Sequence, residues 1–269
     1  MLKTILITGA TDGIGLATAR KLVSYGHRVL LHGRDEKKLS ASQQSLSSLA
    51  RSAVIETYLA DLSQHEQVDA LTQAISDKHK KLDVVINNAG VFKPTPALTT
   101  DQLDMCFVIN TLAPYLLTRN LLPLLDTNSR VVNVSSAAQS PFDLSALSGT
   151  FVVKDPMKAY AQSKLALIMW SSAMAQMGGT QTPSVITVNP GSMLGTKMVR
   201  DGFGIDGGDI NIGAEIIFKA ALSDTFSDSS GKYFDNDLGK FTDPHPYAQD
   251  IVKCSQLVQK MNELLLIWR

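Results

Sequence analysis

Short apolar runs rich in β-branched residues alternate along this chain with longer segments of helical period, and this alternation restricts the fold more than any other feature. The predicted strands cover residues 4–8, 28–32, 54–59, 82–87, 130–135 and 184–189, with a late short strand over 232–234. The predicted helices lie near 13–25, 35–50, 64–80, 99–125, 157–177 and 246–266. Nearly continuous apolar strands are typical of parallel sheets covered on both faces. The pattern therefore predicts an α/β fold: a Rossmann-type doubly wound parallel sheet of about seven strands with helices on both faces.

Length and charge restrict the class of protein further. The 269 residues suit one large domain over 1–269. Lys+Arg and Asp+Glu both number 25, so no net charge attracts nucleic acid or an anionic membrane. No apolar stretch approaches the roughly 20 residues of a membrane span, and an apolar strand close to Met1 leaves no room for a signal peptide. Cys106 and Cys254 have no metal-ligand spacing and suit a reducing compartment. We expect a cytoplasmic protein with no metal, membrane or nucleic-acid partner.

A glycine-rich turn joins the first predicted strand to the first predicted helix. It reads Gly9, Ala10, Thr11, Asp12, Gly13, Ile14 and Gly15. Glycines let the backbone turn sharply and approach a pyrophosphate without a Cβ in the way, while the helix amino terminus supplies N–H donors and a positive dipole. A plain structural turn uses the same residues. Its place between strand and helix at the start of an α/β chain favours a dinucleotide phosphate site.

The spacing Gly-x-x-x-Gly-x-Gly resembles that of the short-chain dehydrogenase/reductase family, and other motifs of this family follow in order over residues 4–196. They are Asp61-Leu62, Asn87-Asn88-Ala89-Gly90, Asn110, Ser136, Tyr160, Lys164 and Pro190-Gly191. The resemblance implies a compact nicotinamide-dependent oxidoreductase acting on a carbonyl or alcohol. It places Asp61 and Leu62 at the adenine. It implies that the cofactor site also includes Asn88, Ala89, Gly90, Tyr160, Lys164, Pro190 and Gly191, and that the catalytic set is Asn110, Ser136, Tyr160 and Lys164.

The end of the second predicted strand bears on the choice between NAD(H) and NADP(H). An NAD enzyme normally offers a carboxylate here to the adenosine ribose hydroxyls. This chain has Gly33 at the matching position and Arg34 next to it, and a guanidinium pairs well with a 2′-phosphate. Asp12 and Asp35 weigh against a phosphate, and Arg34 could instead be a solvated residue of the turn. NADP(H) is favoured, with NAD(H) as the alternative.

Tyr160 and Lys164 stand four residues apart in a predicted helix, so their side chains share one face. A tyrosine has an ordinary pKa of about 10, and a nearby ammonium lowers that value by favouring the phenolate. The pair therefore predicts a group able to give a proton to a developing alkoxide or to take one from an alcohol.

Ser136 and Asn110 complete the implied catalytic set. Neighbouring residues of a strand face opposite ways, so Ser135 competes with Ser136, and only the resemblance selects Ser136 as the group that holds the substrate oxygen. Asn110 lies in an apolar helical segment, where an unpaired amide is costly to bury. In the family the matching asparagine bends the helix and holds a water linked to the lysine.

Two segments are candidates for the substrate side. Residues 137–159 form a segment longer than in compact family members, loosely similar to retinol dehydrogenases and carbonyl reductases, which either lines the pocket or packs on the surface. Glycines over residues 192–212 suggest a lid, with an ordinary flexible loop as the alternative. Thr196 stands one residue later than the family's usual nicotinamide-binding threonine. Apolar neighbours, namely Phe92, Met193, Leu194 and Phe203, indicate an uncharged small-molecule substrate.

Partners and rival functions complete the interpretation. The 157–177 segment is apolar nearly all round, which predicts a buried helix. Family members commonly pair this helix across subunits, so we expect a homodimer or homotetramer, with a monomer that uses the same residues as core as the alternative. An NADP(H)-sensing binding protein that does no chemistry is the main rival function. The intact catalytic set argues against it, and the glycine spacing argues against epimerase chemistry.

Overall fold

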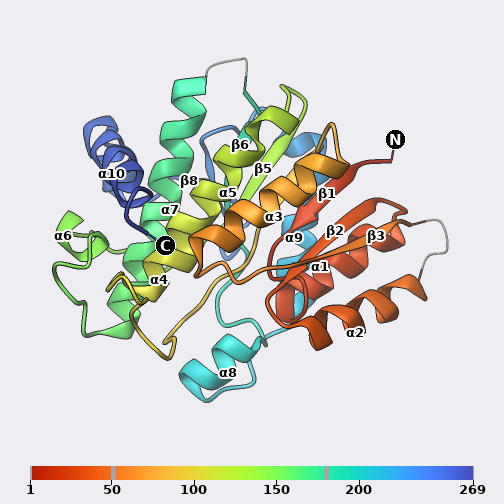
Figure 1. The fold of residues 1–269 in the computed structure, drawn as a ribbon, viewed down its shortest axis with the longest axis horizontal. Helices are drawn as coiled ribbons and strands as arrows, with labels where there is room; N and C mark the ends of the chain where they lie inside the picture. Colours follow the sequence, from red (N-terminus) through yellow and green to blue (C-terminus); the bar gives the residue numbers. More distant parts are fainter. Residues whose placement is uncertain (1, 50–52, 179–181, 269) are drawn as a thin grey trace.

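The structure is a computed structural model, described here for residues 2–49, 53–178 and 182–268. Within these residues, eight strands form one sheet in the order β3-β2-β1-β4-β5-β6-β7-β8 (Figure 1). They are β1 Thr4–Ile7, β2 Arg28–Gly33, β3 Ile55–Leu59, β4 Val84–Asn87, β5 Arg130–Val134, β6 Ser184–Asn189, β7 Tyr233–Asp235 and β8 Lys240–Thr242. All neighbouring pairs are parallel except β7 with β8. The predicted α/β fold is confirmed. Its strand order reverses beside β1, where open sheets bind ligands at the carboxyl ends of their strands.

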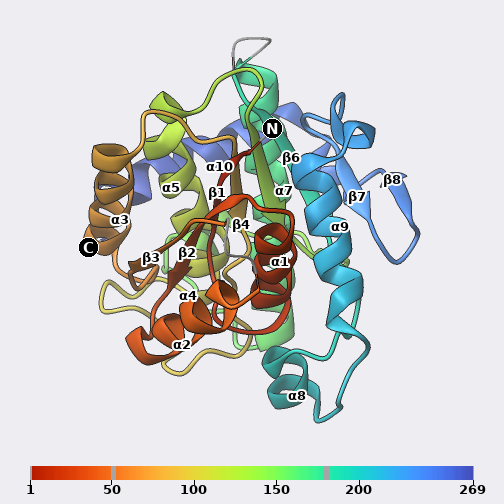
Figure 2. The same ribbon diagram turned by 90° about the vertical axis from the view of Figure 1, so that its right-hand side faces the viewer.

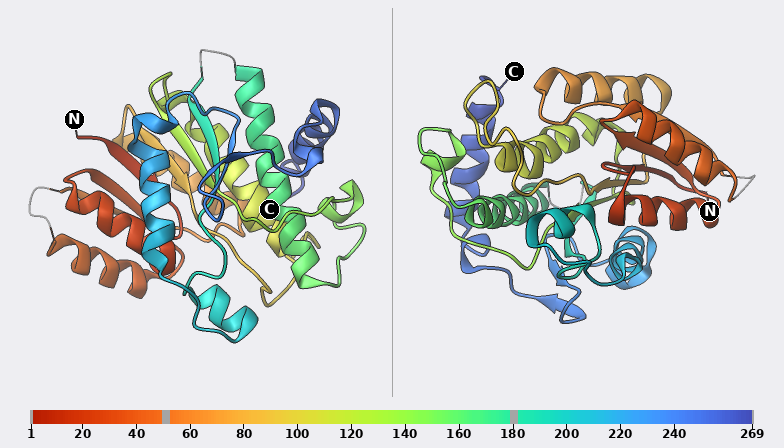
Figure 3. Two further views of the ribbon diagram at one scale, coloured as in Figure 1. Left: turned by 180° about the vertical axis from the view of Figure 1, so that it is seen from behind. Right: turned by 90° about the horizontal axis from the view of Figure 1, so that it is seen from below.

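Helices cover both faces of the sheet (Figures 2 and 3). They are α1 Gly13–Ser24, α2 Glu36–Ser47, α3 His65–Lys78, α4 Met105–Phe107, α5 Ala113–Leu121, α6 Leu144–Leu147, α7 Pro156–Gly178, α8 Lys197–Phe203, α9 Ile210–Leu222 and α10 Ile251–Leu264. Strand residues alternate between two cores. Ile5 and Ile7 face the core that α1, α2 and α9 cover, whereas Leu6 faces the core that α3, α5, α7 and α10 cover. Burial on both faces explains why the strands are mostly apolar.

The structure divides the segment predicted as one helix over 99–125. α4 begins only after Asp104, whose carboxylate caps it by accepting hydrogen bonds of 2.8 and 3.2 Å from the backbone N–H groups of Cys106 and Phe107. A π-helical turn over Val108–Leu112 then precedes α5, and a 3₁₀ turn over Leu122–Leu124 ends the run. Apolar spacing continues through all of these pieces, so periodicity could not locate the breaks.

Four of the helices and strands were not predicted: α6, α8, α9 and β8. α6 and α8 have only four and seven residues. α9 starts near the end of the glycine-rich segment assigned to a lid, and β8 is a three-residue edge strand. Neighbouring glycines hid the helical period of α9, and β8 is too short for an alternation of apolar and polar residues to be recognised. The helix predicted near 35–50 ends at Ser47, and residue 50 lies outside the described residues.

The carboxyl-terminal helix α10 packs against α7 (Figure 1). Its buried residues are Cys254, Leu257, Met261 and Leu264. Trp268, 1% exposed, anchors the end of the chain by donating a 3.1 Å hydrogen bond from Nε1 to the carbonyl oxygen of Ser63. The apolar surface of α7 is therefore covered in part by the chain's own residues. None of the described helices is long and apolar enough to cross a membrane.

Candidate active site

The glycine turn leaves β1 and enters α1 in a conformation that requires glycine. Gly9 and Gly13 have φ angles of 63° and 51°, in the left-handed region. A Cβ on Gly15 would overlap the carbonyl oxygen of Gly9. Asp12 caps α1, accepting a 2.7 Å hydrogen bond from the backbone N–H of Gly13. The turn thus brings the amino terminus of α1, with its positive dipole, to the carboxyl end of β1.

Residues 88–90, which follow β4, pack directly on this turn. The Asn88 amide donates hydrogen bonds of 2.9 Å to the Thr8 carbonyl oxygen and 3.1 Å to the Gly9 carbonyl oxygen. The backbone N–H of Ala89 donates to the Thr8 hydroxyl at 3.0 Å. A Cβ on Gly9 would lie 2.9 Å from the Ala89 Cα. Two motifs about 80 residues apart in sequence are therefore one structural unit, at the point where the strand order reverses.

His32 belongs to the same unit, although it was not predicted as a site residue. Its Nδ1 accepts a 3.3 Å hydrogen bond from the Gly9 backbone N–H, and its Nε2 lies 3.0 Å from the Ala60 carbonyl oxygen. Burial lowers the pKa of His32 to about 4, so the ring is neutral at pH 7 and Nε2 carries the proton. The ring connects the glycine turn to the end of β3, where Asp61 and the buried Leu62 follow. The sequence did offer one sign of this role, because His32 is a polar residue in a mostly apolar strand.

Exposed cations follow the carboxyl end of β2, among them Arg34 and Lys38. Arg34 follows Gly33, where a Cβ would lie 2.5 Å from the Thr11 methyl carbon. Lys38 places its Nζ 3.9 Å from an Asp12 carboxylate oxygen. Asp35, the other acidic residue of concern, caps α2 by accepting a 3.0 Å hydrogen bond from the Lys38 backbone N–H. Both Asp12 and Asp35 therefore face helix amino termini, whose dipoles offset part of their charge.

Ser136 and Tyr160 meet at the carboxyl end of β5. The Ser136 hydroxyl lies close enough to the Tyr160 phenol to lower its pKa. The competing Ser135 is buried and donates a 3.0 Å hydrogen bond to the Lys164 carbonyl oxygen, so its hydroxyl is used to dock β5 on α7. The structure therefore brings together the serine that the resemblance selected and the tyrosine of the Tyr-x-x-x-Lys pair.

The predicted lowering of the Tyr160 pKa is wrong for this structure. Burial raises the pKa of Tyr160 to about 12 and outweighs the effect of the nearby Ser136 hydroxyl, which lowers the pKa. Lys164 is 4% exposed, and its Nζ lies 5.7 Å from the centre of the Tyr160 ring and donates a 2.8 Å hydrogen bond to the Val134 carbonyl oxygen. Burial also lowers the pKa of Lys164 to about 8. The phenol is therefore protonated at neutral pH.

Asn110 lies in the π-helical turn, with both amide groups engaged. Its Oδ1 accepts from the Val91 N–H at 2.8 Å, and its Nδ2 donates to the Val91 carbonyl at 3.0 Å and to the Ser163 hydroxyl at 2.9 Å. A Cβ on Gly90 would lie 3.2 Å from the Asn110 Oδ1 and 3.4 Å from the Lys164 Nζ. Asn110 and Lys164 thus flank Gly90, and π-helical turns are frequent at functional sites.

The lid segment contacts the site through aromatic rings. Phe203 of α8 stacks on Phe92, with ring centres 5.2 Å apart, and Phe92 meets the Tyr160 ring edge-on at 5.4 Å. The Lys93 Nζ donates a 2.9 Å hydrogen bond to the Gly202 carbonyl oxygen. Of the apolar residues expected near the substrate, Phe92 and Phe203 reach Tyr160 in this way. Met193 is exposed and Leu194 is buried beneath Gly191.

Thr196 lies beside the glycine turn. Its Cγ2 is 3.4 Å from where a Cβ on Gly13 would be, and its hydroxyl caps α8 by accepting a 3.2 Å hydrogen bond from the Val199 N–H. Gly13 lacks a side chain that would crowd this threonine. Thr196 is therefore close to the glycine turn despite its unusual spacing in the sequence.

The segment 137–159 is packed in part against the main core. Phe142 meets Phe107 edge-on at 6.5 Å between ring centres, and Leu147 on α6 is fully buried. The Gln162 side chain donates a 2.9 Å hydrogen bond to the Pro141 carbonyl oxygen. Phe151, by contrast, is 59% exposed. The first half of this segment therefore packs against the rest of the chain.

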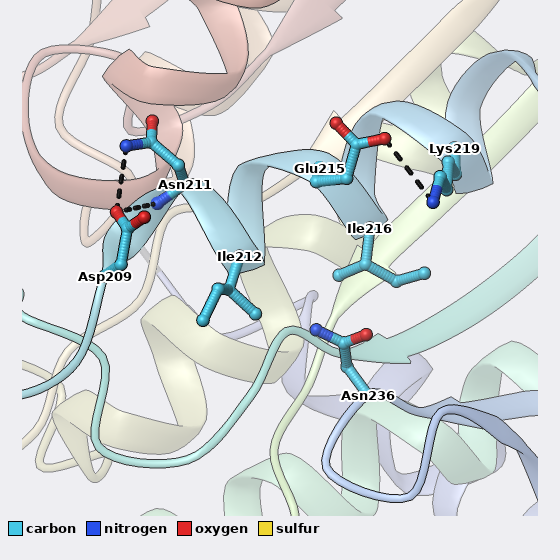
Figure 4. Close-up of a pocket in the computed structure, with 7 residues that line it drawn as sticks. All are labelled: Asp209, Asn211, Ile212, Glu215, Ile216, Lys219 and Asn236. Atoms are coloured by element: carbon cyan, nitrogen blue, oxygen red, sulfur yellow. Dashed lines mark hydrogen bonds and ion pairs between the residues drawn. The ribbon is translucent and has the colours of Figure 1, made fainter.

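A groove beside α9 is lined by none of the predicted site residues (Figure 4). Its lining residues are Asp209, Asn211, Ile212, Glu215, Ile216, Lys219 and Asn236. The charged residues there bind other residues of the groove, since Lys219 pairs with Glu215 at 3.5 Å and Asp209 accepts hydrogen bonds of 2.9 and 2.8 Å from Asn211. Asn236 is the exception, because it donates a 2.9 Å hydrogen bond to the Pro190 carbonyl oxygen of a predicted cofactor motif.

Comparison with known proteins agrees with this geometry. The sequence model of a family described as short chain dehydrogenase matches residues 3–203. Human retinol dehydrogenase 13 is 28% identical over 268 residues, covering 92% of this chain and 80% of that protein. A protein structure from Mycobacterium paratuberculosis has a TM-score of 0.79 at 27% identity, covering 98% of this chain and 93% of the other. A short chain dehydrogenase structure from Shigella flexneri, complexed with NADP, has a TM-score of 0.70 at 25% identity, covering 87% and 97%. The chain therefore belongs to the short-chain dehydrogenase/reductase family, whose members are NAD(P)-dependent oxidoreductases.

Proposed function

We propose that this chain is an NADP(H)-dependent reductase or dehydrogenase that acts on a carbonyl or alcohol group of an apolar small molecule, with Tyr160 as the acid/base. The observation that carries the proposal is the buried Lys164 beside the Tyr160 ring, with the Ser136 hydroxyl close enough to the phenol to lower its pKa. When bound, the nicotinamide would supply a hydride to the carbonyl carbon or accept one from the alcohol carbon. Ser136 would hold the substrate oxygen, and Tyr160 would exchange a proton with it.

The carboxyl ends of the strands supply the residues that would hold the cofactor. They are Gly9, Thr11, Asp12, Gly13, Ile14, Gly15, Arg34, Asp61, Leu62, Asn88, Ala89, Gly90, Tyr160, Lys164, Pro190, Gly191 and Thr196. The glycine turn fits a pyrophosphate, because its backbone takes conformations open to glycine and faces the α1 amino terminus. The exposed Arg34 and the nearby Lys38 favour the 2′-phosphate of NADP(H) over NAD(H). Complexes of structural relatives with NADP support this choice.

The protonation states favour carbonyl reduction. With a pKa of about 12, Tyr160 keeps its proton at pH 7 and can give it to the oxygen of a carbonyl that accepts a hydride. Lys164 and Asn110, whose side chains both approach Gly90, would position the phenol. Phe92 and Phe203 make the approach to Tyr160 aromatic, which suits an apolar substrate.

We further propose that residues 1–269 act as one cofactor-binding domain with a lid over 192–212. The expected homodimer or homotetramer stays a prediction from the resemblance. Because α10 packs on α7, part of the surface that suggested a subunit contact is already covered within one chain.

The test is consumption of NADPH by the purified protein with a panel of aldehydes, ketones and quinones. We expect turnover of at least one apolar carbonyl compound by the parent, and almost none by the matched variant Tyr160→Phe, which should still bind NADPH. Silence of the parent across the panel, together with tight NADPH binding, would instead favour a cofactor-sensing protein.

A further inference from the structure

The turn between β7 and β8, residues 236–239 (the hairpin turn), lies against the residues that follow β6. Family motifs do not include this turn, and the sequence did not predict β8. Figure 4 shows Asn236 of this turn beneath Ile216 of α9, and the same asparagine donates to the Pro190 carbonyl oxygen at 2.9 Å. The hairpin turn therefore contacts a segment that we propose to hold the cofactor.

Asp237 makes the densest set of these contacts. Its Oδ1 accepts a 2.8 Å hydrogen bond from the Ser192 backbone N–H, and its Oδ2 accepts from the Ser192 hydroxyl at 2.6 Å. The Asn189 amide donates to Oδ2 at 3.0 Å. Burial alone would raise the pKa of Asp237, but these donors outweigh it and lower the pKa below its usual value. One carboxylate therefore binds both ends of the segment 189–192.

Asn189 extends the same network to the backbone between those ends. Its Oδ1 accepts a 3.2 Å hydrogen bond from the Gly191 N–H, while its Nδ2 also donates to Asp235 at 2.9 Å. Gly191 has a φ angle of 123°, which L side chains rarely adopt. A turn with this backbone needs outside support to hold one conformation, and the carboxylates of β7 and the hairpin turn supply it.

We propose that Asp237 is a positioning residue that fixes the Pro190-Gly191 turn for the nicotinamide half of the cofactor. The inference assumes the proposed function. It assigns to a residue about 45 positions downstream of the motif a role that the motif itself does not reveal. Loss of the Asp237 carboxylate should loosen the turn before any cofactor arrives, and should weaken cofactor binding more than it slows the chemical step.

The experiment compares Asp237→Ala and Asp237→Asn with the parent and with Asp243→Ala as a control. Asp243 is an exposed aspartate shortly after β8 that has no contact with residues 189–192 among the described hydrogen bonds. In cofactor-free protein we expect hydrogen exchange over 190–196 to be roughly tenfold faster in Asp237→Ala. We expect the Kd and KM for NADPH to rise about tenfold and kcat at saturating NADPH to change by less than about threefold. Asp237→Asn should lie between, because its amide oxygen can still accept one donor.

The outcomes separate this inference from the proposed function. If the parent binds NADPH and Asp237→Ala binds it equally well with unchanged exchange, the inference is wrong and the proposed function stands. A loss of kcat with KM unchanged would also overturn it. If the parent binds no NADPH, both fail. Circular dichroism checks that each variant folds. If Asp237→Ala does not fold, Ser192→Ala replaces it in the same assays, because it removes only the 2.6 Å hydroxyl contact. An NADPH affinity of Ser192→Ala equal to that of the parent would count against the inference.

Discussion

The Lys164 ammonium donates a 2.8 Å hydrogen bond to the carbonyl oxygen of Val134, and this contact anchors a buried cation at the end of β5. Burial lowers the pKa of Lys164 to about 8, whereas the pKa of Tyr160 is raised to about 12. The lysine is therefore charged below about pH 8 and neutral above it, while the phenol keeps its proton throughout. The charge that changes near neutral pH belongs to the lysine, and the first prediction follows from it.

Carbonyl reduction should slow as the pH rises through about 8, because Lys164 loses its charge there and Tyr160 does not. The measurement is kcat/KM for reduction between about pH 6 and about pH 10. Lys164→Arg keeps a cation over this whole range. If it folds and retains activity, its profile should be flat where the parent declines. A parent profile that is level up to about pH 10 would contradict the assignment.

Ser136→Ala and Ser135→Ala form a matched pair on adjacent residues of the same loop. Ser136→Ala should lower kcat by about 10² to 10³, because it removes the hydroxyl that we propose holds the substrate oxygen, with NADPH affinity unchanged. Ser135→Ala removes the buried 3.0 Å bond to the Lys164 carbonyl and should cost about 1 kcal/mol of stability instead. Kinetics and urea unfolding of both variants give the comparison. Equal loss of kcat in the two would remove the distinction between these serines.

Arg34→Ala should weaken NADPH binding by about tenfold or more and leave NADH binding nearly unchanged, because only NADPH carries the 2′-phosphate. Lys38→Ala should act in the same direction with a smaller effect, because part of its charge faces Asp12. Lys37→Ala, also exposed on α2, is the control for a general loss of positive charge. Titration of both cofactors against each variant measures this. A preference for NADPH that survives in Arg34→Ala would exclude Arg34 from this role.

Acid should destabilise the protein through His32. Its pKa is about 4 in the folded state and about 6.5 when unfolded, so the unfolded state binds more protons between these values. The free energy of unfolding should therefore fall as the pH drops from about 6.5 to about 4, by roughly 3 kcal/mol from this one group. Urea unfolding of the parent and of His32→Gln, which cannot titrate, checks the sign. Equal acid dependence in both proteins would count against a buried neutral histidine.

Phe203→Ala should raise KM for apolar carbonyl substrates several-fold, because it removes the ring that stacks on Phe92 beside Tyr160. Phe151→Ala is the matched control, since this phenylalanine is exposed in the 137–159 segment. Its kinetics should equal those of the parent. A rise in KM for Phe151→Ala alone would move the substrate site from the lid to that segment.

Local sequence carried enough information for the sheet and for half of the site. The parallel strands are mostly apolar, so β1 to β6 could be recognised one at a time, and their alternation with helices left few topologies. The glycine turn could be recognised because its requirement for positive φ angles is local. Tyr160 and Lys164 share a face because a helix repeats every 3.6 residues. None of these inferences needs a distant part of the chain.

Long-range packing decided the rest. The facing of Ser135 and Ser136 depends on where α7 lies against β5, and the use of His32 and Asp237 depends on neighbours about 20 to 45 residues away. The sign of the Tyr160 shift shows the limit most clearly. Spacing alone placed an ammonium near the phenol and predicted a lower pKa, but a pKa also depends on how much water the folded chain excludes, and here burial outweighs the neighbouring groups. Local backbone geometry follows from neighbouring residues in the sequence, whereas the burial of a side chain and its distant contacts are set only when remote segments pack together.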